Sequence, residues 1–163
     1  MATTNVTLKK QPTPLSAFAS LRTWQLISIA FGIFVSGYLT NVKATNVIMA
    51  CVANGAFNCE KVQSSAYSMM FGIPIAYFGL ATYLLLAFLI LFEKRIPFLE
   101  DYGQILILAI TLGAWIFSMY LVYIQFFVLE ALCPWCLAHE ANFTVFFLLT
   151  LMRYIRTQRE IEE

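Results

Sequence analysis

Four long apolar runs occupy most of this 163-residue chain and leave it few ways to fold in water. Hydrophobic residues make up 61% of the sequence and charged residues only 12%, whereas about a quarter of a soluble domain is charged. Membrane spans are expected at about 23–42, 69–92, 105–128 and 134–152, each long enough to cross a bilayer as a helix. The first run is longer than the apolar core of a signal peptide. The predicted fold class is therefore an all-α integral membrane protein, a bundle of four transmembrane helices.

The same pattern predicts one domain with short ends. Residues 1–20 are polar and mixed and are expected to form a flexible tail, followed by a four-helix membrane domain over 21–155 and a second tail over 156–163. The one sizeable connection, Lys43–Ser68, joins the first two spans, and its middle is too apolar for an ordinary solvated loop. We expect it to lie on the membrane surface or fold back over the helices, with Cys59–Ser68 forming a short interfacial helix.

Four spans put both termini on one side of the membrane, and the basic residues assign that side. Only Lys43 and Lys61 lie in the connections on the opposite side. The other basic residues gather at the end shared by the termini: Lys9, Lys10, Arg22, Lys94, Arg95, Arg153, Arg156 and Arg159. The positive-inside rule therefore predicts cytoplasmic termini, and all four cysteines then lie on the extracytoplasmic face, where disulfides persist. No basic stripe suggests a nucleic-acid partner.

The stretch Cys133-Pro134-Trp135-Cys136 opens the fourth span with a C-x-x-C motif. The positive end of a helix dipole lowers the pKa of a thiol beside it and so produces a usable thiolate. A structural disulfide gains little from closing so small a loop. Because a second pair, Cys51 and Cys59, lies on the same face, a redox relay is favoured over inert staples. A zinc site of four thiolates is a further alternative, but it requires all four cysteines to be reduced on an oxidising side.

Electrons collected by such thiols need an acceptor. The chain has no G-x-G-x-x-G motif and no soluble domain that would hold a flavin or nucleotide, so a lipid-soluble quinone reaching Cys136 from the bilayer is the expected acceptor. His139 and Glu140 follow Cys136 by three and four residues and share its helical surface. They are candidates for exchanging protons with the acceptor or for tuning the reactivity of the Cys136 thiolate. An equally good alternative is that both side chains are simply hydrated at the membrane interface. Aromatic residues are candidate pocket walls, although bundle packing or interfacial anchoring would explain each of them as well: Phe71, Tyr77, Trp115, Tyr123, Trp135 and Phe143.

These residues together resemble the bacterial branch of the vitamin K epoxide reductase family. The resemblance covers nearly all of the membrane region and has three parts in the right order and spacing: Cys51-x7-Cys59-Glu60-Lys61-Val62-x-Ser64-Ser65, then Phe71-Gly72-Ile73-Pro74, then Cys133-Pro134-Trp135-Cys136. It implies a four-helix bundle around a quinone, with the connection between the first two helices folded over the active site.

The resemblance also implies a role for each cysteine. Cys51 would exchange with a reduced thioredoxin-fold protein, Cys59 would pass electrons to Cys133, and Cys136 would face the quinone. Ser65 would help to hold the loop over the quinone site. Because the chain stops at Glu163 without a fused thioredoxin-like domain, the partner is expected to be a separate periplasmic or lumenal protein (DsbA-type). A bacterial inner membrane is the expected location; an endoplasmic reticulum membrane would keep the same topology.

Two departures from the family's vertebrate members bear on the substrate. Those enzymes carry a tyrosine where this chain has Glu140. Their asparagine near the start of helix two has no counterpart here, and Ser68 lies at about that position. Reduction of a respiratory quinone (ubiquinone or menaquinone) is therefore favoured over reduction of vitamin K quinone or its epoxide. Two alternatives stay open: an unrelated four-helix disulfide-forming oxidoreductase with its C-x-x-C in the first connection, and a non-catalytic module stapled by disulfides.

Overall fold

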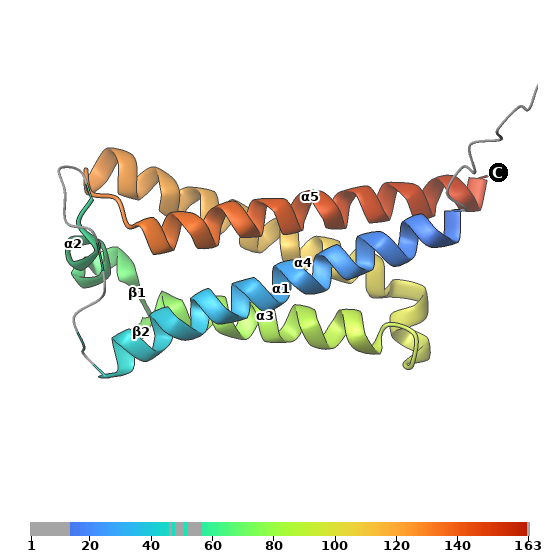
Figure 1. Ribbon diagram of the computed structural model, residues 1–163, viewed down its shortest axis with the longest axis horizontal. Coiled ribbons are helices and arrows are strands. Elements are labelled where there is room, and N and C mark those ends of the chain that lie inside the picture. The colour runs from blue at the N-terminus through green and yellow to red at the C-terminus, as the bar shows by residue number, and fades with distance from the viewer. Residues whose placement is uncertain (1–13, 46, 48–50, 52–56, 163) are drawn as a thin grey trace, which may run out of the picture.

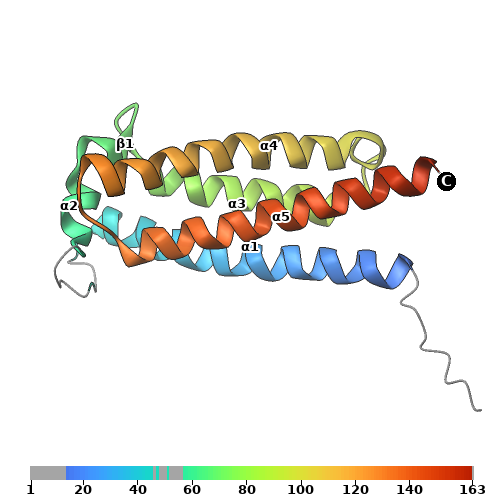
Figure 2. The same ribbon diagram turned by 90° about the horizontal axis from the view of Figure 1, so that it is seen from above.

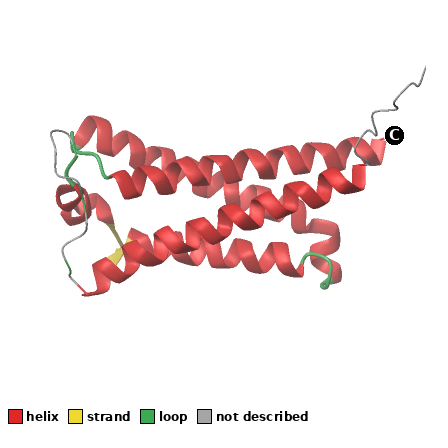
Figure 3. Ribbon diagram, viewed as in Figure 1, coloured by secondary structure: helices red, strands yellow, loops and turns green. Residues whose placement is uncertain are grey.

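The computed structural model describes residues 14–45, 47, 51 and 57–162, and its architecture is a bundle of four long helices (Figure 1). These helices are α1 (Pro14–Thr45), α3 (Ile75–Phe92), α4 (Pro97–Tyr123) and α5 (Pro134–Glu162). Each contains a stretch long and apolar enough to cross a membrane. Colouring by secondary structure shows how little of the described chain lies outside helices (Figure 3). The predicted all-α four-helix membrane fold is confirmed.

Short elements gather at one end of the bundle (Figure 2). The connection after α1 contains helix α2 (Cys59–Ser64), the 3-10 turn η1 (Ala66–Ser68) and the strands β1 (Met69–Met70) and β2 (Ile73–Pro74). The final turns of α4 continue as a π-helix, η2 (Ile124–Val128). The start of α1, the α3–α4 turn and the end of α5 lie together at the opposite end. Both ends of the four-helix region are therefore on one side, as an even number of spans requires.

The second span begins later than the hydrophobic run suggests. Residues 69–74 form an antiparallel hairpin in which Met70 pairs with Ile73, and helix α3 starts only at Ile75. The two turn residues, Phe71 and Gly72, have φ values of 54° and 79°. Positive φ at both central residues is what a tight two-residue hairpin requires, and it cannot continue a right-handed helix. Pro74 is the last residue before α3.

The bundle is tightly packed where α1, α3 and α5 meet. Tyr83, Leu86, Ile90 and Phe146 are completely buried there. The Tyr83 ring fits against α1 because residue 32 is a glycine: a Cβ at Gly32 would come within 2.1 Å of the ring. This close approach fixes the positions of α1 and α3 beside the polar site described next.

A buried polar cluster joins the helices at the end away from the cysteines. Arg153 on α5 pairs with the carboxylate of Glu93, just past α3, and both side chains are buried. Gln25 on α1 donates to the Thr150 hydroxyl at 3.0 Å and accepts from Arg153 at 3.3 Å. Paired ionic groups of this kind are tolerated in an apolar bundle because each satisfies the other.

Candidate active site

The loop after α1 docks directly on the segment that precedes the C-x-x-C motif. The Asn58 N–H donates to the Leu132 carbonyl at 3.0 Å, and Phe57 and Leu132 form a parallel β-bridge. Asn58 also caps helix α2, since its Oδ1 accepts from the Lys61 N–H at 2.9 Å. The residue before Cys59 is thus bonded to the residue before Cys133.

This docking buries cysteines of both pairs in one apolar cluster. Cys59 is 2% exposed and Cys133 is fully buried, and Cys51 and Cys136 pack against them. Cys51 and Cys59 form a disulfide, whereas Cys133 and Cys136 are free thiols. The structure therefore brings the two cysteine pairs together, one oxidised and one reduced.

Hydrogen bonds to its sulfur lower the pKa of Cys133. The thiol of Cys136 makes the largest contribution, burial opposes it, and the backbone N–H groups of Cys136 and Trp135 contribute further. The Cys136 N–H lies 3.4 Å from the Cys133 sulfur. Helix α5 begins at Pro134, and the Leu137 N–H donates to the Cys133 carbonyl at 2.9 Å. Cys133 therefore has the thiolate-stabilising position at a helix start that the motif predicts.

The π-helix η2 presents a polar side chain to the same cysteine. Gln125 is buried, and its Oε1 accepts from the Cys133 N–H at 3.1 Å, while its backbone carbonyl accepts from the Ala131 N–H at 3.1 Å. A π-turn inside an α-helix frequently marks a functional position. Gln125 was not singled out from the sequence, although a polar residue inside an apolar span is the signal that would have found it.

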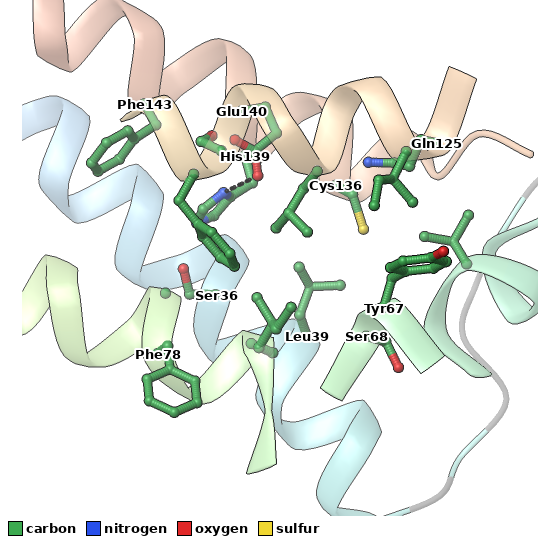
Figure 4. Close-up of a pocket in the computed structure, with 18 of the residues that line it drawn as sticks. Ser36, Leu39, Tyr67, Ser68, Phe78, Gln125, Cys136, His139, Glu140 and Phe143 are labelled. Atoms are coloured by element: carbon green, nitrogen blue, oxygen red, sulfur yellow. Dashed lines mark hydrogen bonds and ion pairs between the residues drawn. The ribbon is translucent and has the colours of Figure 1, made fainter. Parts of the chain in front are cut away.

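Below the docked loop, the helices enclose a cavity of about 160 Å³ (Figure 4). A cavity of about 150 Å³ is enough to bind a single benzene ring. Cys136, His139 and Glu140 project into it from α5, and Leu39, Phe117 and Phe143 contribute apolar wall. The site thus suits a planar ring beside a reduced thiol.

Hydrogen bonds within the loop hold it over this cavity. Lys43 on α1 donates to the Gln63 carbonyl at 2.6 Å, and the Gln63 amide lies 3.6 Å from the Cys136 sulfur. Ser65 donates to the Val62 carbonyl at 2.8 Å, and Ser68 donates to the carbonyls of Gln63 and Ser65. The two serines line the cavity, but their hydroxyl protons are used to shape the loop.

Six residues proposed from the sequence line the cavity, and five do not. Those at the cavity are Ser65, Ser68, Cys136, His139, Glu140 and Phe143. Those placed elsewhere are Phe71, Tyr77, Trp115, Tyr123 and Trp135. Phe71 occupies the hairpin turn and is 93% exposed, whereas the Trp115 ring stacks on Phe147 and the Tyr123 ring on Phe127.

Other cavity residues were not singled out from the sequence. Besides large apolar residues, they include small or polar positions inside the apolar spans, namely Ser36, Gly79, Thr82, Tyr83 and Ser118. The spacing of Gly79, Thr82 and Tyr83 puts them on one face of α3, which is the pattern expected for a wall facing the bundle interior.

Comparison with known protein families gives a match over residues 23–151 to the model described as "Vitamin K epoxide reductase family". The matched region runs from the first turns of the α1 span almost to the end of the α5 span and includes all four cysteines and every cavity residue. The chain belongs to the vitamin K epoxide reductase family and is an oxidoreductase of the membrane.

Proposed function

We propose that this protein is a thiol–quinone oxidoreductase that generates disulfides. It takes electrons from a reduced thioredoxin-fold protein at Cys51–Cys59, passes them to Cys133–Cys136 and delivers them to a quinone in the membrane. The observation that carries the proposal is the arrangement of the two cysteine pairs in one buried cluster beside a ring-sized cavity that Cys136 lines.

Each transfer is a thiol–disulfide exchange through a mixed disulfide. The partner's dithiol becomes a disulfide while the loop pair is reduced, and the loop pair then re-forms its disulfide by reducing Cys133–Cys136. Cys59 lies in the cluster with Cys133 and is the donor of that second step. When the C-x-x-C disulfide re-forms, the quinone gains two electrons and two protons and leaves as quinol.

The different solvent exposure of Cys51 and Cys59 supports different roles for these two cysteines. Cys51 is half-buried, whereas Cys59, the first residue of α2, is buried in a cluster with Val62, Ala131 and Cys133. A protein partner approaching from outside therefore meets Cys51 first. The basic residues gather at the other end of the bundle, so we place the cysteine end on the extracytoplasmic side of a bacterial inner membrane, where a separate thioredoxin-like partner would work.

Dithiol-dependent quinone reduction by the purified full-length protein tests the proposal. With dithiothreitol as donor, wild type is expected to reduce short-chain ubiquinone or menaquinone, and Cys136→Ala is expected to be inactive. Cys51→Ala should keep the reaction with dithiothreitol but lose oxidation of a thioredoxin-fold partner. Vitamin K epoxide in the same assay is expected to remain unreduced. An inactive wild-type protein would contradict the proposed function, and a Cys51→Ala variant that still oxidises the partner would contradict the relay order.

A further inference from the structure

The polar atoms of the cavity fall into two groups. At the loop, the hydroxyls of Ser65 and Ser68 already donate to backbone carbonyls. Deeper in the bundle, three buried oxygen atoms have no hydrogen-bond partner among the described residues: Ser36 Oγ on α1, Ser118 Oγ on α4 and Glu140 Oε2 on α5. Their residues are 1%, 6% and 8% exposed. Among the described residues that line the cavity, the buried side-chain atoms without a hydrogen-bond partner therefore lie toward its inner end.

Leaving such atoms unsatisfied is costly. Each buried donor or acceptor without a partner costs roughly 1–3 kcal/mol, and native proteins rarely leave several in one place. The three oxygen atoms belong to residues on three different helices, and all three residues line the same cavity. This convergence indicates a ligand with a polar group at its inner end.

His139 completes this inner group. Its Nδ1 lies 3.2 Å from Glu140 Oε1, and its ring packs edge-on against Tyr83 with the ring centres 5.3 Å apart. With Nδ1 engaged by the carboxylate, Nε2 is the nitrogen left for a ligand. A Cβ built on Gly79 would lie 3.4 Å from His139 Nε2 and 3.8 Å from Ser36 Oγ. The imidazole nitrogen and the serine hydroxyl therefore face the same small space beside α3 (Figure 4).

Quinone reduction needs a proton at each end of the ring. The two carbonyl oxygens of a para-quinone lie on opposite sides of the ring, and each gains a hydrogen when the quinol forms. An oxygen near Cys136 can receive its proton from the thiols. The other oxygen is separated from sulfur by the ring itself, so its proton has to come from another group in the wall.

We infer, on the basis of the proposed function, that Ser36 and His139 bind the carbonyl oxygen farthest from Cys136 and that His139 delivers its proton. Glu140 is a positioning residue, since its carboxylate orients the imidazole through Nδ1. The electrons and protons of this reaction balance within the site. Cys133 and Cys136 supply two electrons as their disulfide forms and release two protons; one reaches the near oxygen, and the other replaces the proton that His139 gives to the far oxygen.

A single-turnover experiment separates binding from proton delivery. Full-length protein is reduced at Cys133–Cys136, freed of reductant and mixed with increasing concentrations of short-chain ubiquinone, and the rate of thiol oxidation is recorded. Ser36→Ala is expected to weaken the apparent Kd about fivefold, the effect of losing one neutral hydrogen bond, with the saturating rate unchanged. His139→Gln keeps a hydrogen-bonding amide but cannot transfer a proton, so the saturating rate should fall about 10²-fold or more while the Kd holds. Glu140→Gln should lower the same rate without weakening binding.

Thr40→Ala is the matched control. Thr40 lies one turn after Ser36 on α1, and its buried hydroxyl also has no hydrogen-bond partner in the described part of the chain, but Thr40 does not line the cavity. It should behave as wild type. If the cavity's inner oxygens are satisfied by water only, Ser36→Ala will bind quinone like wild type, and the inference is overturned. A His139→Gln variant that reacts at the wild-type rate also overturns it. Failure of the wild-type dithiol to react with any quinone would instead overturn the proposed function.

Discussion

Replacing Gly32 with alanine tests the contact that fixes α1 against α3. The added Cβ would lie 2.1 Å from Tyr83 Cζ and 2.2 Å from Cε1, far inside van der Waals contact. The ring has no room to retreat, because Tyr83 is fully buried and its hydroxyl accepts a hydrogen bond from Asn142 at 3.0 Å. Gly32→Ala must therefore push α1 away from α3 or displace the ring.

The size of the effect follows from these contacts. Overpacking a close-packed interior costs about 1–3 kcal/mol. Losing the Tyr83–Asn142 hydrogen bond adds about 1 kcal/mol. The better helix propensity of alanine offsets about 1 kcal/mol of this. A net loss of about 1–3 kcal/mol in unfolding free energy is expected, together with weaker quinone reduction because Tyr83 lines the cavity.

The assay is reversible unfolding in mixed detergent micelles, with Gly37→Ala as the matched control. Gly37 lies on the same helix, and a Cβ there meets nothing within 4 Å, so this variant should be as stable as wild type or slightly more stable. In a Tyr83→Leu background, Gly32→Ala should cost much less, since the clashing ring is gone. If Gly32→Ala unfolds together with wild type and Gly37→Ala, the close packing of α1 on α3 is refuted.

Three further predictions concern other parts of the molecule. Glu93→Gln leaves the Arg153 guanidinium buried without its carboxylate, so unfolding free energy in the same assay should fall by about 3–5 kcal/mol; an unchanged value would contradict a desolvated pair. Because its pKa is lowered, Cys133 should form thiolate, seen by ultraviolet absorbance, at lower pH than an ordinary cysteine, and Cys136→Ala should move this transition to higher pH. Asn58→Ala removes the N-cap of α2 and should destabilise this helix by about 1 kcal/mol. Dithiothreitol should then reduce the Cys51–Cys59 disulfide faster than in wild type, and equal rates would contradict the capping role.

The long-range architecture was predictable because it depends on length and hydrophobicity. A helix is the structure that satisfies its own backbone in lipid, so four apolar runs of spanning length specify four helices. The start of α3 was not predictable by this route, since Met69–Pro74 is apolar as well. Two residues with positive φ, Phe71 and Gly72, override that signal and make a hairpin instead.

The candidate site was likewise predictable in part. His139 and Glu140 were placed beside Cys136 by spacing along a single helix, which needs no knowledge of neighbouring elements. Trp115 and Tyr123 were candidates only by residue type, and whether they face the cavity depends on how α4 is rotated against α5. That rotation is set by contacts such as the hydrogen bond from Trp115 to Thr144 at 3.1 Å, and no local pattern encodes it.

The bond from Asn58 to the Leu132 carbonyl has a kinetic consequence for the proposed relay. This hydrogen bond joins the backbone just before Cys59 to the backbone just before Cys133. It does not involve the sulfur atoms, so a change in their redox state does not by itself break it. The two pairs are then already held in one cluster, so exchange between them does not have to wait for a microsecond loop opening. Transfer from the loop pair to the C-x-x-C pair should accordingly not be limited by loop motion, and raising solvent viscosity should leave the rate of this step unchanged.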